Sequence, residues 1–277
     1  MVNDLRFENY FLFTQHSLST FDKCPLKFKK RYLENLKWDN YLGEEVRKRL
    51  EMGNNFHLMA YRYFQGIEPG LTEDVEGYEE LDRWVSSLMR SFEKEDSKRY
   101  FPEYKLRMSK GVLRLEANYD LIIIDKDRIE VWDWKTHVKD KENSKKDEKF
   151  QRIRLERSLQ TVVYLYVLKE EIKLLTGREI PSENINMYYW QPEPKRVLAE
   201  INYSDMMHSN FEKQLKEKIK KILEYDYSNF DKVLYKKSCK YCEFNWFCNN
   251  EKVDYKAMEE DEDFLDELEW DDIEELT

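Results

Sequence analysis

The stretch Asn118-Tyr-Asp-Leu-Ile-Ile-Ile-Asp-Lys-Asp-Arg-Ile-Glu-Val-Trp-Asp-Trp-Lys-Thr-His137 determines the expected fold. Its two apolar runs, residues 118–125 and 127–137, are typical of β-strands, and the polar residues between them predict a hairpin turn at Lys126-Asp127. In that register the numbers of facing residues sum to 253, so Asp120 faces Asp133. The turn lacks the glycine usual in a two-residue hairpin loop, so a register shifted by one residue is the alternative.

The hairpin would bring two acids and a lysine together. Side chains alternate between the two faces of a strand, so Asp133 and Lys135 point the same way. Opposed carboxylates such as Asp120 and Asp133 destabilise a strand pair unless a cation lies between them. The arrangement therefore predicts a site that holds a divalent ion and orients a water molecule. An ordinary exposed strand with a surface salt bridge is the alternative interpretation.

This pattern resembles the catalytic core of the PD-(D/E)xK nuclease superfamily, with Asp120 as the first acid and Asp133-Trp134-Lys135 as the D-x-K. The resemblance implies an α/β fold with a restriction-endonuclease-like central mixed β-sheet flanked by helices. It also implies metal-dependent hydrolysis of phosphodiester bonds in DNA. The chain departs from the family at Ala117, where the G-x-x-D that contains the first acid usually has its glycine.

Two motifs near the start of the chain resemble the RecB-like branch of the superfamily. Residues 17–28 have the pattern S-x-S-x-x-x-x-C-P-x-x-F, which is similar to the opening signature of that branch. Ser19 or Thr20 would cap the helix expected there. Gly53-x-x-x-His57 is similar to the branch's histidine motif, which implies that His57 is a metal ligand. A histidine satisfied in the core or at the surface is the alternative.

Three more residues match positions of the same branch. Gln160 and Tyr164 lie four residues apart in the helix expected from residue 158 to 175, and they form the Q-x-x-x-Y signature. The resemblance implies that they hold the scissile strand or orient the metal ligands, whereas a polar stripe on a buried helix is the alternative. Glu103 opens the strand expected before the hairpin, where relatives carry an acid, which implies contact with the metal directly or through water.

The resemblance also implies a mechanism. A Mg²⁺ or Mn²⁺ ion would lower the pKa of a bound water and offset the charge that develops on the phosphate. Its implied ligands are Asp120, Asp133, the Trp134 carbonyl and His57. Lys135 would orient the water or stabilise the phosphate charge. The substrate class that this branch implies is DNA with single-stranded ends, so we expect an exonuclease.

The four cysteines of the chain are Cys24, Cys239, Cys242 and Cys248. Three closely spaced thiols need a fourth to complete a tetrahedral or cubane site, and Cys24 is the one candidate. One cysteine near the start and three near the end resemble the iron–sulfur site of RecB-like nucleases and CRISPR-adaptation exonucleases, which implies a [4Fe-4S] cluster. A structural zinc with four thiolates, or four unligated buried cysteines, are the alternatives.

Charge is unevenly distributed along the chain. Residues 258–277 contain twelve acids and no Lys or Arg, and subtracting them from the net charge of −10 leaves +2 for residues 1–257. Basic runs at residues 27–31, 139–157 and 213–221 could neutralise phosphates, or they could be solvated helix faces. The acidic segment, punctuated by apolar residues, is either a solvated tail or a segment that docks a partner or mimics DNA.

Residue patterns predict four regions. They are a helical section with the first cluster cysteine (1–100), the nuclease core (101–235), the iron–sulfur module (236–250) and the acidic tail (251–277). Helices are expected over residues 44–65, 74–96 and 205–224, and strands over 101–108, 111–116, 183–191 and 196–203. Residues 136–158, rich in charge, are expected to be a mobile loop that leads into the next helix.

Location and partners follow from absences in the sequence. There is no secretory signal and no apolar run long enough to span a membrane, so we expect a cytoplasmic protein. No P-loop motif occurs, so a helicase or CRISPR-adaptation protein that works with the chain would be a separate partner. Two alternative functions remain, a non-catalytic DNA-binding scaffold and a redox-sensing subunit of a helicase–nuclease complex.

Overall fold

The computed structural model describes residues 4–8, 10–36, 43–69, 78–136 and 145–254. The chain forms two compact units. The sheet unit comprises residues 51–108 and 116–212, and the terminal unit comprises residues 1–50, 109–115 and 213–277. The four-region division expected from the sequence stays a prediction. The predicted acidic tail falls on residues 255–277, which lie outside the described part of the chain.

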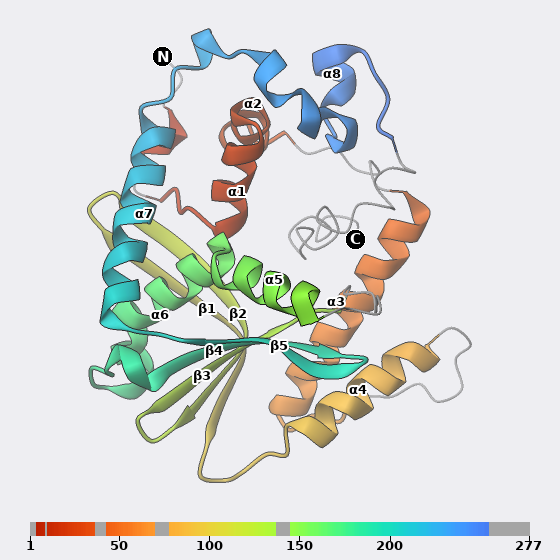
Figure 1. The fold of residues 1–277 in the computed structure, drawn as a ribbon, viewed down its shortest axis with the longest axis vertical. Coiled ribbons are helices and arrows are strands. Elements are labelled where there is room, and N and C mark those ends of the chain that lie inside the picture. Colours follow the sequence, from red (N-terminus) through yellow and green to blue (C-terminus); the bar gives the residue numbers. More distant parts are fainter. Residues whose placement is uncertain (1–3, 9, 37–42, 70–77, 137–144, 255–277) are drawn as a thin grey trace. The chain divides into compact units, whose positions relative to one another are not determined.

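A five-stranded mixed sheet organises the sheet unit (Figure 1). Its order follows the chain: β1 (Arg99–Lys110), β2 (Leu113–Asp125), β3 (Arg128–Trp134), β4 (Ile185–Pro192) and β5 (Lys195–Asn202). The pairs β2–β3 and β4–β5 are antiparallel, whereas β3–β4 is parallel. Parallel neighbours need a long crossover, and the helices α5 (Lys145–Glu156) and α6 (Leu159–Thr176) supply it. The predicted α/β fold with a mixed sheet is confirmed.

The β2–β3 hairpin has the predicted register. Leu121 pairs with Trp132 and Asp125 with Arg128, so facing residues sum to 253 and no slip occurs. Lys126 replaces the missing turn glycine by adopting a left-handed conformation, with φ 55°. A non-glycine residue takes this conformation less readily, but the apolar faces on both strands fix the register more strongly than the turn does.

Helices α3 (Glu44–Phe64) and α4 (Glu79–Ser91) carry the apolar core on one face of this sheet. The predicted helix over residues 44–65 therefore forms without interruption at Gly53. Helix α4 corresponds to the helix expected over residues 74–96. The first residues of that expected helix, 74–77, lie outside the described part of the chain. The buried cluster comprises Phe56, Ala60, Phe64, Leu81, Trp84, Val85, Leu88, Phe92, Leu121, Ile123, Trp134 and Trp190. It fixes α3, the helix that carries His57, against β2 and β3.

The long helix α6 covers the other face. Nearly all of its first ten residues are buried, Ser158 caps it by accepting a hydrogen bond from the Thr161 amide, and Gly177 ends it with a left-handed φ of 76°. On β4, Tyr189 reaches Thr161 of α6 while Trp190 joins the α3–α4 core, as strand alternation requires. The loop expected over residues 136–158 is wrong in its second half, where α5 forms from Lys, Glu, Gln and Arg residues that favour a helix.

The terminal unit is built from both ends of the described chain. It contains η1 (Leu5–Phe7), α1 (Gln15–Lys23), α2 (Pro25–Phe28), η2 (Lys29–Leu33), most of α7 (Asp205–Leu223), η4 (Tyr227–Asn229), η5 (Lys232–Tyr241) and α8 (Asn245–Asn249). Buried Arg6 joins these parts by donating to the Ile222 and Tyr225 carbonyls, at 2.8 Å each.

Helix α1 begins earlier than the sequence predicted. Thr14 is its N-cap and forms a capping box with Ser17, whereas Ser19 and Thr20 lie inside the helix. The predicted cap is therefore wrong, because Thr14 satisfies the first amides before Ser19 could. Within the described residues, no helix is both long and apolar enough to cross a lipid bilayer.

Candidate active site

Three side chains from α3, β1 and β2 converge beside the hairpin. His57 Nδ1 lies 3.1 Å from Glu103 Oε1 and 3.5 Å from Asp120 Oδ1. One ligand atom from each of the three residues lies within 4.8 Å of the others, as a shared metal ion requires. Glu103 has a φ of 46°, a left-handed conformation that costs a non-glycine residue about 1–3 kcal/mol. The sheet unit thus holds Glu103 in place against a local preference.

Electrostatics in this group favour a cation. Burial lowers the pKa of His57, but Asp120 and the hydrogen-bonded Glu103 outweigh burial and raise that pKa to about 9. Burial also raises the pKa of Asp120 well above its usual range, and the neighbouring Asp133 and Glu103 add to this against the effect of His57. A divalent ion would replace the histidine proton as the partner of both acids. Two carboxylates suit Mg²⁺ or Mn²⁺, and the imidazole favours a first-row transition ion such as Mn²⁺, so the donor set fits.

Asp133, Lys135 and Gln160 form a second, closed group. Gln160 donates from Nε2 to Asp133 Oδ1 at 2.7 Å and accepts from Lys135 Nζ at 3.1 Å, while Lys135 Nζ lies 3.0 Å from Asp133 Oδ2. The Asp133 side chain is only 2 % exposed. The backbone amide of Lys135 donates to the Trp190 carbonyl, so β4 holds the end of the D-x-K strand. A buried carboxylate with a charged partner and an amide donor is fixed in orientation.

A backbone hydrogen bond joins the two groups. The Trp134 amide donates to Asp120 Oδ2 at 2.6 Å, which leaves Asp120 Oδ1 toward His57. Of the predicted ligands, His57 and Asp120 lie in the metal-competent group together with Glu103, whereas the Asp133 oxygens contact Gln160 and Lys135 instead. The Trp134 side chain belongs to the apolar core. The structure therefore brings the predicted site residues into two linked groups.

Tyr164 lies one turn of α6 after Gln160. Its side chain is buried, its ring centroid lies 5.0 Å from that of Tyr119, and its backbone carbonyl accepts from the Tyr119 hydroxyl at 2.8 Å. These contacts of Tyr164 tie α6 to β2. A role for Tyr164 on the substrate strand stays a prediction.

Tyr189 contacts the site and was not predicted from the sequence. Lys135 Nζ lies 5.4 Å from the centroid of its ring. The Tyr189 hydroxyl lies 2.8 Å from Thr161 Oγ1 and 3.3 Å from Ser158 Oγ, at the start of α6. Burial raises the pKa of Tyr189, with a further contribution from Asp133, so the phenol stays neutral. No motif marks this residue, because a tyrosine in a buried strand is common in cores.

The four cysteines converge in the terminal unit. All four line one small cavity of about 30 Å³ between α2, η5 and α8. Cys24 caps α2 by accepting from the Lys27 amide at 3.4 Å, and Cys239, Cys242 and Cys248 lie in or beside η5 and α8. Lys27, Lys30 and Lys232 line the same cavity. Cations around four thiols suit a group that carries negative charge.

Two properties of these thiols bear on what they bind. Among the described residues, no three cysteine sulfurs lie within 4.8 Å of one another. A tetrahedral zinc with Zn–S bonds near 2.3 Å would hold its sulfurs about 3.8 Å apart. A cubane separates them further, because each thiolate binds a different iron. Burial raises the pKa of Cys24 and of Cys248, and it raises the pKa of Cys242 to about 12, so ligand binding must displace protons.

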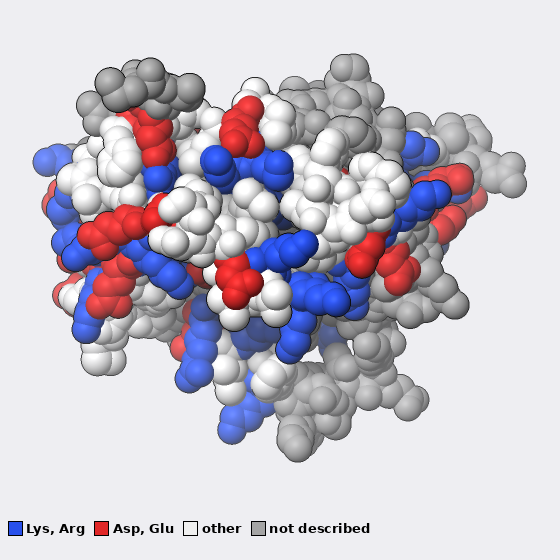
Figure 2. Space-filling view, turned by 90° about the horizontal axis from the view of Figure 1, so that it is seen from above, with Lys and Arg blue, Asp and Glu red and all other residues white. Residues whose placement is uncertain are grey.

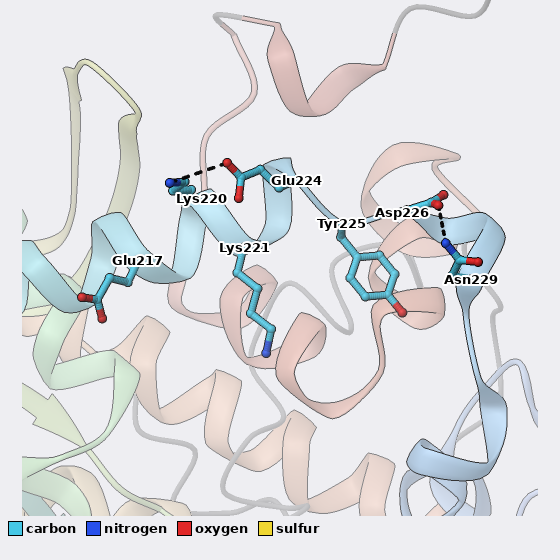
Figure 3. A pocket seen from close by; sticks show the side chains of 7 residues that line it. All are labelled: Glu217, Lys220, Lys221, Glu224, Tyr225, Asp226 and Asn229. Atoms are coloured by element: carbon cyan, nitrogen blue, oxygen red, sulfur yellow. Dashed lines mark hydrogen bonds and ion pairs between the residues drawn. The ribbon is translucent and has the colours of Figure 1, made fainter.

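A separate hollow of about 510 Å³ lies at the end of α7 (Figure 3). Its charged groups partner one another: Lys220 Nζ lies 3.8 Å from Glu224 Oε1, and Asn229 donates to Asp226 Oδ2 at 2.6 Å. The residues that line it include no histidine or cysteine. Among the described residues, the three donors close enough to share one metal ion are His57, Glu103 and Asp120, and not the acids of this hollow.

Comparisons with known proteins place the chain. The family model for the PD-(D/E)XK nuclease superfamily matches residues 12–249. Among solved structures, a protein from Eubacterium rectale described as a candidate exonuclease is 11 % identical, with a TM-score of 0.46, covering 76 % of this chain and 80 % of its own. The protein SSO0001 is 16 % identical, with a TM-score of 0.36 and 87 % of each chain covered. No curated protein matches the chain.

Proposed function

Because the chain belongs to the PD-(D/E)XK nuclease superfamily, whose members are metal-dependent nucleases, we propose that it is a DNA exonuclease that acts on single-stranded ends. One observation supports the active site most strongly. The partly buried His57–Glu103–Asp120 group is joined to the Asp133–Lys135–Gln160 group by the hydrogen bond from the Trp134 amide to Asp120. A metal-competent set from α3, β1 and β2 is thus linked through the β2–β3 hairpin to a lysine that can act on a phosphate.

Each residue then has a defined role. His57, Glu103 and Asp120 would hold Mg²⁺ or Mn²⁺, and Asp133 would join them when substrate displaces its present partners. The metal supplies a bound water of lowered pKa and offsets charge on the phosphate. Lys135 orients that water or stabilises the charge on the non-bridging oxygens. Hydrolysis forms a bond between the water oxygen and phosphorus and breaks the bond from phosphorus to the leaving sugar oxygen.

Gln160 positions the two catalytic side chains. It contacts both Asp133 and Lys135, so it fixes the spacing between the acid and the ammonium. Capped by Ser158, α6 presents Gln160 from its first turn. Side chains locked by such supporting contacts reach the geometry that catalysis requires.

Digestion of labelled oligonucleotides tests this function. We expect the wild-type chain to degrade single-stranded DNA from an end only when Mg²⁺ or Mn²⁺ is present. Asp120→Asn, Asp133→Ala and Lys135→Ala should each abolish cleavage and retain DNA binding. Glu116→Gln is the matched control, because Glu116 is an acid on the same strand as Asp120 that pairs with Arg107 instead. Retained cleavage in the Asp133 or Lys135 variant would refute the assignment.

For the cysteine site we propose a [4Fe-4S] cluster. The convergence of all four cysteines on one cavity supports a shared metal group, and the similarity of their spacing to the iron–sulfur site of RecB-like nucleases supports iron over zinc. Bridging residues 24 and 239 closes a loop at an entropic cost on the order of 5 kcal/mol, which the cluster bonds would offset. Anaerobic purification with iron and zinc analysis tests this: we expect a brown protein with about four irons per chain. A colourless zinc protein would overturn it.

The remaining parts of the proposal concern partners. The chain would work in recombination, repair or CRISPR adaptation, with a helicase or a CRISPR-adaptation protein as a separate partner. Support comes from the RecB-like motifs alone. A brown protein that binds DNA but cuts none under any metal condition would favour a scaffold or redox-sensing role instead.

A further inference from the structure

The surface formed by η5 and α8 carries exposed apolar side chains. Val233 is 73 % exposed, Leu234 74 %, Trp246 54 % and Phe247 58 %. Scattered single apolar residues are normal on a protein surface, but four on two adjoining short elements form a patch. A patch of this kind indicates a surface that something covers.

Exposed lysines surround the same patch. Lys232, Lys236, Lys237 and Lys240 lie on η5, and Lys252 follows α8. Within the described residues, no carboxylate forms an ion pair with Lys232, Lys236 or Lys237. Figure 2 shows one face of the molecule, on which Lys and Arg side chains alternate with Asp and Glu side chains and with uncharged surface. The occupant of this lysine–apolar face should therefore be both acidic and apolar.

Residues 255–277 have that composition. They contain twelve acids and one lysine, and apolar residues recur among the acids: Phe264, Leu265, Leu268, Trp270, Ile273 and Leu276. A nucleic acid would match the lysines, but it gains little from aliphatic side chains such as Val233 and Leu234. An acidic and apolar peptide matches both parts of the face.

The preceding residues bring this segment to the face. The Lys252 carbonyl accepts from Asn245 of α8 at 3.3 Å, and the Asp254 amide donates to the Lys240 carbonyl of η5 at 3.0 Å. The described part of the chain therefore ends, at Asp254, beside η5. A ten-residue 3₁₀ helix is about 20 Å long, and a few extended residues already span that distance. The segment can reach every part of the face.

We propose that residues 255–277 bind back onto the lysine–apolar face of η5 and α8 and compete there with nucleic acid. The competition, though not the binding, rests on the proposed nuclease function. A tethered segment has an effective concentration in the millimolar range. Even a docking constant on the order of 0.1 mM would then weaken nucleic-acid binding at this face by about tenfold.

Carbodiimide crosslinking of the full chain tests the binding, because it joins only carboxylates and amines in contact. We expect links within one chain from the acids at 259–275 to Lys232, Lys236 and Lys237. Lys213 and Lys220 of α7 are internal controls, since they are exposed but each lies beside a glutamate of the same helix. Equal yields at α7 and η5 would overturn the proposal, as would links found only between two chains.

A variant with polar substitutions tests whether the apolar side chains of the face contribute to docking. Val233→Ser with Leu234→Ser should reduce the yield of links to η5, whereas Leu174→Ser, 70 % exposed on α6, should leave it unchanged. All three substituted side chains are exposed, so neither variant should disturb folding. An unchanged yield in the double variant would show that charge alone attracts the segment and would overturn the docking face.

Oligonucleotide affinity tests the competition. Changing Asp266, Glu267, Glu269, Asp271 and Asp272 to amides should tighten binding about tenfold. The same changes should have no effect when Lys236→Gln and Lys237→Gln are also present. An equal gain in both backgrounds would mean that the acids act through the overall field, which overturns competition at this face. Expected crosslinks with no oligonucleotide binding in any variant would refute the nuclease proposal and leave the docking intact.

Discussion

At the scale of single residues, the site depends on contacts that reach across the sheet. Asp133, at the end of a strand, is oriented by Gln160 of α6 and by Lys135 two positions on. Lys135 in turn lies over the ring of Tyr189 on the neighbouring strand. The reactive geometry is therefore a property of three elements, and each contact can be tested separately.

Tyr189 should influence cleavage through Lys135. Tyr189→Leu removes the ring beneath the ammonium, and a partly buried cation–π contact is worth about 1–2 kcal/mol, so we expect kcat to fall about tenfold with little change in KM. Tyr189→Phe keeps the ring and loses only the hydroxyl, and the Thr161 hydroxyl still donates to the Leu155 carbonyl. The phenylalanine variant should therefore restore most of kcat. Equal losses in both variants would point to a packing role alone.

Proton release should accompany metal binding at His57. The pKa of His57 in the metal-free protein is raised to about 9, so the imidazole carries a proton at pH 7, and a metal ligand must be neutral. Metal affinity should then rise with pH below about 9, by at most about tenfold per unit, and level off above it. Calorimetry in two buffers of different protonation enthalpy measures the released proton. His57→Gln should abolish the release, and a wild-type protein that releases none would contradict the prediction.

At the scale of elements, α6 links stability to the site. Its N-cap Ser158 accepts from the Thr161 amide at 3.2 Å, and Gln160 lies in the turn that this cap fixes. Strand β4 and helix α6 share the Tyr189–Thr161 contact. Changes to the start of α6 should thus affect folding and cleavage together.

Ser158→Ala should cost about 1 kcal/mol of unfolding free energy, because the first amides of α6 lose their acceptor. Thermal melting should show a decrease of about 2–4 °C in Tm for a protein of this size. Cleavage should fall as well, since Gln160 loses its fixed position. Thr14→Ala, which removes the cap of α1 in the terminal unit, is the control that should lower stability without lowering the rate of the chemical step.

Sequence patterns predicted the elements better than their contacts. The 253 register followed from the apolar runs of residues 118–125 and 127–137, because one face of each strand must be buried. The cap at Thr14 was missed because several residues near the start of α1 can all act as caps. Thr14 and Ser17 form the capping box, but Ser19 and Thr20 have the same kind of side chain. The roles of Tyr189 and of Gln160 toward Asp133 could not be predicted, since they depend on residues that meet only through the crossover between β3 and β4.

At the scale of the whole molecule, the chain divides its functions between two units. The sheet unit holds the metal-competent group, and the terminal unit holds the four cysteines. Beginning and end of the described chain are joined in the terminal unit by Arg6 and by the ion pair of Lys27 with buried Glu243, whose atoms lie 2.8 Å apart. Protein contacts and cysteine ligands would therefore stabilise the same unit.

Removal of the proposed cysteine-bound cluster should destabilise one unit selectively. Hydrogen exchange after anaerobic chelation should speed up in residues 15–36 and 227–254, because these segments lose the ligand that links them. Exchange in residues 116–134 and 159–176 should stay slow, since the sheet core contains no cysteine. Uniformly faster exchange would show that the two units unfold as one. Cys24→Ser should reproduce the effect of chelation.

The terminal unit combines segments from both ends of the sequence, so the order of synthesis determines when its cysteines can meet. Cys24 leaves the ribosome early, but its partners at 239, 242 and 248 follow more than two hundred residues later. At about 5–20 residues per second, the first cysteine waits on the order of tens of seconds for the others. During that interval residues 51–212 can already build their sheet. The nascent chain must therefore keep one thiol reduced and unpaired while the rest of the protein folds, and insertion of the proposed cluster would be a late step.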